Sequence, residues 1–208
     1  MRFQPDLTTR VGGWLFRRRT WLPAPVALAI LTLRIGQAPP SAALTAAGVA
    51  ITLAGEALRL WGVHHIGVIS RTRSDRLGPL VAGGPFGFVR NPLYAGNIAL
   101  WIGFAVTARL VWLAPVIFVL LGAEYHAIVR WEEDLLGSRL GEAYRDYWSR
   151  VPRWFPARKG RKDSKDREGS AVSAPSAAFA WRETLFSERG TLIAIAVGYL
   201  LLWTKARF

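Results

Sequence analysis

The chain has no cysteine and one methionine among its 208 residues, and its 14 acidic residues are outnumbered by 27 basic ones. The absence of cysteine excludes disulfide bonds, zinc sites built on thiolates and a cysteine nucleophile. Three histidines are present, His64, His65 and His126, and their spacing matches none of the usual zinc patterns. We therefore expect no metal site, and we predict that these histidines line an interface or the wall of a binding site.

Apolar residues are abundant: 51% of the chain is hydrophobic, with ten Trp and ten Phe, and the mean hydropathy is +0.21. A soluble domain of this size rarely combines that composition with a net charge of +13, whereas a membrane protein gathers apolar residues in spans and charges in loops. A span needs roughly 20 apolar residues. The sequence therefore predicts an all-α integral membrane protein with about five transmembrane helices, in the apolar blocks 21–35, 42–63, 93–106, 110–129 and 192–203.

Basic residues are concentrated in three segments, 2–19, 71–90 and 130–167, and the loops on the other side carry few. The positive-inside rule then places the N-terminus and all three segments in the cytosol. No nucleic-acid-binding motif accompanies these charges, so we expect them to attract anionic lipid headgroups rather than nucleic acid. A second span follows the first at once, so we expect no cleaved signal peptide.

The chain divides into four predicted segments. These are a basic cytosolic arm (1–20), a membrane core (21–156), a flexible linker (157–178), and an interfacial helix with a last transmembrane helix (179–208).

Two features of the core position its polar residues. The spans on either side of Ala108 and Arg109 are joined by only a few residues, which predicts an antiparallel helical hairpin. After the hairpin, apolar residues recur at intervals of three and four over 133–151, which predicts an amphipathic helix, bent near Gly137 and Gly141, that lies on the membrane surface or caps a pocket.

The glycine-rich segment 83–87 precedes a helix that is predicted to begin at Pro92, with Asn91 as its possible cap and Arg90 beside it. Free N–H groups at a helix start, together with a guanidinium, suit a carboxylate or phosphate. The alternative is a tight turn with Arg90 extending to lipid headgroups.

Glu132 and Glu133 follow the hairpin, where two carboxylates near apolar surface are unfavourable unless solvated or paired. They could bind an ammonium or sulfonium group or pair with Arg90, or they could form a solvated helix end beside Arg130. A site for an anion, a cation and apolar groups fits a zwitterionic cofactor such as S-adenosylmethionine next to a lipidic substrate.

Two motifs lie on either side of the hairpin: Gly84-Pro85-Phe86-x-x-x-Arg90-Asn91-Pro92-x-Tyr94-x-Gly96-Asn97, and Glu132-Glu133-x-x-Leu136-x-x-x-Leu140-Gly141-x-x-Tyr144-x-x-Tyr147-x-x-x-Val151-Pro152. In both motifs and in their order, roughly over 58–156, the chain resembles the isoprenylcysteine carboxyl methyltransferase and phospholipid methyltransferase superfamily. The resemblance implies S-adenosylmethionine-dependent methyl transfer to a lipophilic acceptor, in a cytosolic cofactor pocket capped by the amphipathic helix and open sideways to lipid. It implies cofactor-binding roles for Gly84, Pro85, Arg90, Asn91, Tyr94, Asn97, Glu132 and Glu133.

The carboxyl methyltransferases usually have His at the place of Asn91 and Tyr at the place of Phe86, so the resemblance does not extend to prenylcysteine specificity. Asn at that place is familiar in phospholipid-type and bacterial relatives. We expect the protein to be integral to a bacterial inner membrane, with its N-terminus and active site in the cytosol.

The chemistry leaves the catalytic roles open. A carboxylate or thiolate acceptor needs only a cationic group to orient it, for which Arg90, Arg153 or an arginine in 71–76 could serve. An amine acceptor needs a proton acceptor, for which Glu133 or His65 is conceivable. We expect Arg90, Glu133 and Arg153 to be the catalytic residues, while the acceptor and the oligomeric state stay open.

For several other residues we predict a structural role rather than a functional one. Glu56 and Arg59 stand three apart and are predicted to form an intrahelical ion pair. Tyr144 and Tyr147 are predicted to pack. Two alternative functions stay open for the whole chain: a membrane reductase of the sterol type, and a non-catalytic membrane scaffold of the same fold.

Overall fold

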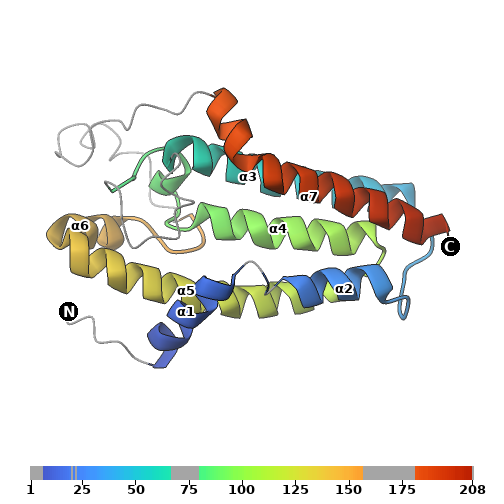
Figure 1. Ribbon diagram of the computed structural model, residues 1–208, viewed down its shortest axis with the longest axis horizontal. Coiled ribbons are helices and arrows are strands. Elements are labelled where there is room, and N and C mark those ends of the chain that lie inside the picture. The colour runs from blue at the N-terminus through green and yellow to red at the C-terminus, as the bar shows by residue number, and fades with distance from the viewer. Residues whose placement is uncertain (1–6, 20, 22, 67–79, 157–180, 208) are drawn as a thin grey trace.

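The structure is a computed structural model that describes residues 7–19, 21, 23–66, 80–156 and 181–207. The described residues are helical and contain no strand. The elements are α1 (Leu7–Arg18), α2 (Ala24–Thr32), α3 (Ala42–Ile66), the 3₁₀ turn η2 (Gly84–Gly87), α4 (Pro92–Thr107), α5 (Leu113–Leu140), α6 (Glu142–Arg150) and α7 (Trp181–Arg207). Helices α2, α3, α4, α5 and α7 run along the long axis, and η2 and α6 lie near one end (Figure 1).

Among the described residues, three helices are long and apolar enough to cross a membrane: α3, α5 and α7. Helix α4 has 16 residues, about 24 Å at 1.5 Å per residue, and α2 has nine, about 14 Å, whereas a hydrocarbon core is roughly 30 Å thick. Helix α2 stops early because Leu33 is already extended and Gly36 has a φ of 69°. The predicted count of five transmembrane helices is therefore not confirmed.

Helices α3 and α4 are antiparallel and come into backbone contact through facing glycines. A Cβ built on Gly55 would lie 2.8 Å from the Gly96 carbonyl oxygen, and one on Gly48 would lie 2.7 Å from that of Gly103. Glycines allow this approach because they have no side chain to hold the helices apart. The contact fixes the start of α4 beside the end of α3, where the motif residues lie.

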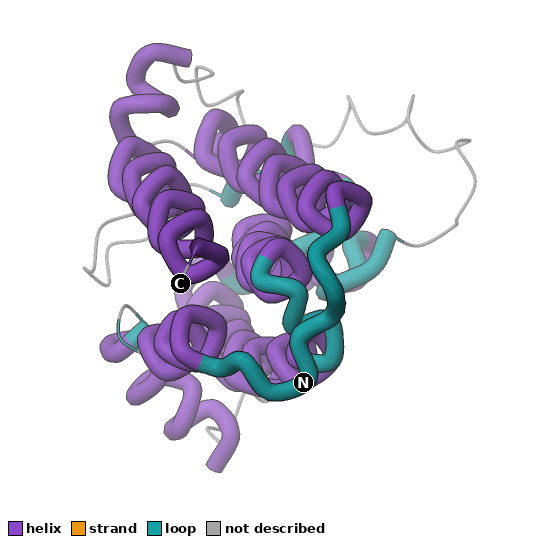
Figure 2. The backbone as a smooth tube through the Cα atoms, turned by 90° about the vertical axis from the view of Figure 1, so that its right-hand side faces the viewer, coloured by secondary structure: helices purple, strands orange, loops and turns teal. Residues whose placement is uncertain are grey.

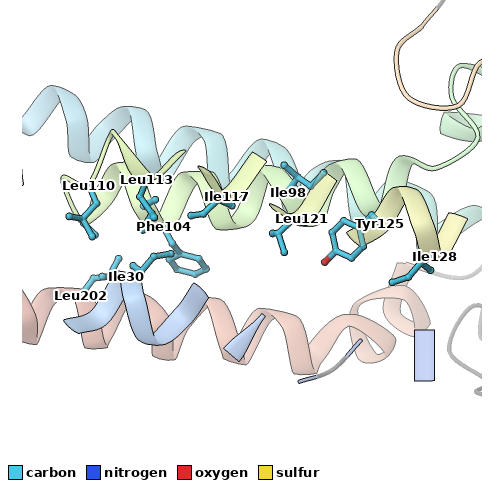
Figure 3. Packing of buried hydrophobic residues seen from close by; sticks show 12 residues of the cluster. Ile30, Ile98, Phe104, Leu110, Leu113, Ile117, Leu121, Tyr125, Ile128 and Leu202 are labelled. Carbon is cyan, nitrogen blue, oxygen red and sulfur yellow. The ribbon is translucent and has the colours of Figure 1, made fainter. Parts of the chain in front are cut away.

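Helices α4 and α5 form the predicted hairpin. The chain turns through Ala108 and Arg109, and Arg109 has a φ of 64°. Buried side chains from both helices meet along its length (Figure 3), and Ile30 of α2 and Leu202 of α7 complete the cluster. The residues of this cluster on the hairpin include Ile98, Phe104, Leu110, Leu113, Ile117, Leu121, Tyr125 and Ile128.

Helix α1 packs directly on α5. A Cβ on Gly12 would overlap the Ala127 carbonyl, and one on Gly13 would lie 2.9 Å from Nε1 of Trp131. The Phe16 and Trp131 rings are 4.7 Å apart, centroid to centroid. The basic N-terminal helix is thus held against the carboxylate end of α5.

The amphipathic segment after the hairpin is interrupted at one of the two predicted glycines. Helix α5 continues through Gly137 and ends at Leu140, and Gly141 has a φ of 58° that separates it from α6. Tyr144 and Tyr147 are buried, as predicted.

Helix α7 lies along α3, and Figure 2 shows it as one member of the bundle seen end on. Its Tyr199 hydroxyl donates to Oγ1 of Thr52 at 2.7 Å, and Nζ of Lys205 donates to the carbonyl of Ile30 at 2.6 Å. The predicted linker 157–178 and the arginine-bearing loop 71–76 both lie outside the described residues.

Candidate functional site

The polar residues of the two motifs converge where η2, the start of α4, the end of α5 and α6 meet. The backbone N–H of Arg90 donates to the Pro152 carbonyl at 2.9 Å, and Nδ2 of Asn91 donates to the Arg153 carbonyl at 3.3 Å. These bonds fasten the segment after α6 to the loop before α4. Asn91 is the N-cap residue of α4, which begins at Pro92 as predicted, but its side chain makes no capping bond and forms this cross-link instead.

Glu133 is the centre of a buried ion cluster. Its carboxylate accepts two hydrogen bonds from Arg153, from Nη2 at 2.5 Å and from Nε at 3.1 Å, and Nη2 of Arg90 lies 3.3 Å from its Oε1. Glu133 is 6% exposed, so it is not part of a solvated helix end. Because two guanidinium groups already neutralise this carboxylate, it acts here as an organiser of Arg90 and Arg153 rather than as an available base.

Arg90 is held on several sides but keeps one donor unused. Nη1 donates to the Trp148 carbonyl at 3.2 Å, and its guanidinium lies 4.9 Å from the centroid of the Trp148 ring. Its buried Nε has no hydrogen-bond partner among the described residues. Desolvation lowers the pKa of Arg90, and the nearby Glu133 carboxylate opposes that shift. The side chain can therefore offer a buried N–H to an anionic ligand group.

Two phenols close this cluster from α6. Burial raises the pKa of both Tyr144 and Tyr147, so each stays neutral. The Tyr147 hydroxyl donates to the Phe86 carbonyl at 2.9 Å and ties α6 to η2.

Glu132 faces a different neighbour. The Tyr94 hydroxyl donates to its Oε1 at 2.9 Å, and the Tyr94 ring stacks on Tyr125 with centroids 4.8 Å apart. Adjacent residues of a helix point about 100° apart, so α5 directs Glu133 toward Arg90 and Glu132 toward α4. Glu132 is therefore the carboxylate that remains suited to a cationic ligand group.

Gly84 touches the end of α3. It has a φ of 57°, and a Cβ on it would overlap the His65 ring. The neighbouring Pro85 is buried, and Nδ1 of His65 lies 2.9 Å from the Trp61 carbonyl. The glycine-rich turn thus places His65 beside the predicted cofactor-binding backbone.

Asn97 belongs to a second polar cluster, deeper among the helices. Its Oδ1 accepts a hydrogen bond from Nη1 of Arg59, whose Nη2 also lies 2.7 Å from Oε2 of Glu188 and 3.2 Å from Oγ1 of Thr191. The predicted Arg59–Glu56 pair is present at 3.3 Å. Arg59 also joins α4 and α7, which the sequence pattern did not predict. The available signal was Glu188, a carboxylate four residues before the apolar block 192–203.

A cavity of about 380 Å³ lies next to this second cluster, between α2, α4 and α7. It is lined mainly by apolar side chains, and its polar lining residues are Arg59, Asn97 and Thr191. The residues around Glu133 do not line it, so the predicted cofactor pocket is not confirmed.

The residues of α3, α4 and α5 that form the two polar clusters lie in a region that is similar to known proteins. Residues 43–143 match the model of the phospholipid methyltransferase family. The chain is similar to that family over slightly less than half of its length. The family lies in the superfamily that the two motifs resemble, and its members are membrane methyltransferases. The match and the three apolar helices both support an integral membrane protein.

A curated relative, the nickel-cobalt-cadmium resistance protein NccN of Alcaligenes xylosoxydans xylosoxydans, is 30% identical over 116 residues, which are 56% of this chain and 51% of the relative. The chain thus spans about half the length of the curated relative that it matches. No solved structure matches this chain.

Proposed function

We propose that this protein transfers a methyl group from S-adenosylmethionine to a lipophilic acceptor at the cytosolic face of a bacterial inner membrane. The observation that carries the proposal is the pairing of Glu132 with Tyr94 beside the Arg90–Glu133–Arg153 cluster, within the region that matches the phospholipid methyltransferase family.

The donor set fits the cofactor. Arg90 offers a buried Nε–H for a carboxylate, and Glu132 offers a carboxylate for an ammonium or sulfonium group. Gly84, Pro85, Asn91 and Tyr94 would line the same site. When bound, S-adenosylmethionine supplies a methyl group whose bond to sulfur breaks as the bond to the acceptor forms.

The protein's own contribution is orientation and exclusion of water. Glu133 holds Arg90 and Arg153 in place, and either guanidinium can orient an acceptor carboxylate or thiolate. Since Glu133 is committed to this pairing, His65 is the better placed proton acceptor for an amine. Asn97 faces the apolar cavity, so we assign it to the acceptor side of the site rather than to cofactor binding.

Calorimetric binding of S-adenosylmethionine and S-adenosylhomocysteine to the detergent-purified protein tests the proposal. We expect both to bind in roughly the micromolar range. Glu132→Gln removes one charged partner, and loss of a hydrogen bond to a charged group, about 1.5–3 kcal/mol, predicts binding at least tenfold weaker. Glu142→Gln, at an exposed carboxylate of α6, is the matched control and should bind like the wild type.

A well-folded wild-type sample that binds neither compound would overturn the proposal in favour of a scaffold or a reductase. Equal binding by Glu132→Gln and wild type would remove Glu132 from the site. The name of the curated relative concerns metal resistance. Among the described residues, no group of three His, Cys, Asp or Glu side chains is placed to hold a metal ion.

The proposed orientation has a separate test that uses the absence of cysteine. Arg17 and Arg18 on α1 and the basic residues of α6 lie at the site end, where they would attract anionic lipid headgroups. In intact spheroplasts, a membrane-impermeant maleimide should label the Ile35→Cys variant. It should label the Ser149→Cys variant only after lysis. The wild type has no cysteine and should give no background labelling. The reverse pattern would place the site outside the cytosol.

A further inference from the structure

Arg19, which directly follows α1, lies beside the candidate site. Helix α1 packs against α5 (Figure 1), although it lies outside the residues that match the family. The Arg19 guanidinium is 4.1 Å from the centroid of the Phe16 ring, and this ring packs against Trp131, the residue before Glu132. Arg19 is partly buried, whereas the neighbouring Arg18 is exposed. The end of α1 thus brings a guanidinium to the part of α5 that carries the site's carboxylates.

The charge of Arg19 reaches the side chains of the site without being neutralised by them. It acts electrostatically on Glu132, Tyr94 and Tyr125. The Arg19 guanidinium nevertheless forms no ion pair and donates no hydrogen bond to another residue in the part of the chain that the structure describes. The Phe16 ring holds it from one side by a cation–π contact, so its N–H groups stay available to a ligand.

A cation and an anion that lie near each other without being paired suit a particular kind of ligand. An α-amino acid carries an ammonium group and a carboxylate on the same carbon atom, so the groups that bind the two must be neighbours. Glu132 is the carboxylate suited to the ammonium, and the cation near it is Arg19. Arg90 also has an unused N–H, but it pairs with Glu133, which points about 100° away from Glu132 on α5.

We infer that Arg19 and Glu132 together bind the amino-acid end of the cofactor, with its carboxylate at Arg19 and its ammonium at Glu132. The inference rests on the proposed function for the identity of the ligand. It makes α1 a wall of the site that the region matching the family does not supply. It also leaves the unused N–H of Arg90 to an anionic acceptor.

Two ligands that differ only in the carboxylate test this assignment: S-adenosylhomocysteine and its decarboxylated analogue, in which hydrogen replaces the carboxylate. Calorimetry on the full-length protein in detergent measures the affinity for each. Arg19→Gln should weaken S-adenosylhomocysteine binding at least roughly tenfold, the scale of a lost hydrogen bond between charged groups. It should change the affinity for the analogue little, because the analogue has no carboxylate to lose.

Arg18→Gln is the matched control. The Arg18 guanidinium also lies over an aromatic ring, 4.6 Å from the centroid of Trp14, but it is exposed. This variant should bind both ligands like the wild type. Glu132→Gln should weaken both ligands, because both keep the ammonium group.

Arg19→Lys is the conservative variant, and it keeps a cation over Phe16. It should retain more of the affinity for S-adenosylhomocysteine than Arg19→Gln does. Since the charge is preserved, it also allows the comparison of the two ligands if Arg19→Gln does not fold, and the preference for S-adenosylhomocysteine over the analogue should then be smaller than in the wild type.

The contrast between the ligands separates binding from support of the fold. If Arg19→Gln weakened both ligands equally, Arg19 would only hold α1 in place, and the inference would be overturned. Unchanged binding of S-adenosylhomocysteine by Arg19→Gln would overturn it as well. Both results would leave the proposed function standing, because the wild type binds. A well-folded wild type that bound neither ligand would overturn the proposed function, and the inference with it.

Discussion

Glu133→Gln should lower the free energy of unfolding by about 3–5 kcal/mol, the typical cost of breaking a buried ion pair by removing one partner. The carboxylate is 6% exposed and accepts hydrogen bonds from Arg153 at 2.5 and 3.1 Å, with Arg90 3.3 Å away. Glutamine keeps the shape but not the charge, so two guanidinium groups would face each other with no anion between them. Equilibrium unfolding in detergent measures the effect.

Asp146→Asn supplies the matched control at the same end of the molecule. Asp146 pairs with Arg150 one turn along α6, but both side chains are about half exposed. An exposed pair contributes about 0.2–1 kcal/mol. If the two variants lost the same small amount of stability, Glu133 would not be the organiser of the site.

The local features of this region were predictable from the sequence because they depend on near neighbours. Proline at the first turn of α4, a glycine that ends α5 and the short hairpin connection are each encoded within a few residues. The residues predicted to bind cofactor were also largely brought together, since the hairpin returns the end of α5 to the start of α4.

The different contacts of Glu132 and Glu133 were not predictable from near neighbours. The sequence presents the two carboxylates as one unit, and only the direction of each side chain on α5 separates them. Asn91 had the position of a helix cap, but the chain after α6 offered its amide a carbonyl acceptor at Arg153. That contact joins residues far apart in sequence, so no local pattern indicates it.

The contribution of α7 was the least predictable part of the fold. Its polar contacts with α3 join residues more than 100 positions apart in the sequence. The Arg59–Glu56 pair already accounted for both of these charges locally. The structure instead uses Arg59 to join three helices at the polar end of the cavity. Arg59 thus links α7 with the region that matches the family.

Arg59→Met should therefore destabilise the protein by about 3–5 kcal/mol, as for other buried ion pairs that lose one partner. Glu56 and Glu188 are 4% and 1% exposed, and the substitution removes the guanidinium that lies 3.3 and 2.7 Å from their carboxylates. Glu188→Gln should also destabilise, because it removes the anion from the same contact. Glu183→Gln, at an exposed carboxylate in the first turn of α7, should change the stability little.

The double variant Arg59→Met/Glu188→Gln tests whether the Arg59–Glu188 ion pair holds α7 against α3. Contacting charges typically couple by about 0.5–3 kcal/mol, so the double variant should lose less stability than the two single variants added together. Additive losses would mean that apolar packing alone positions α7.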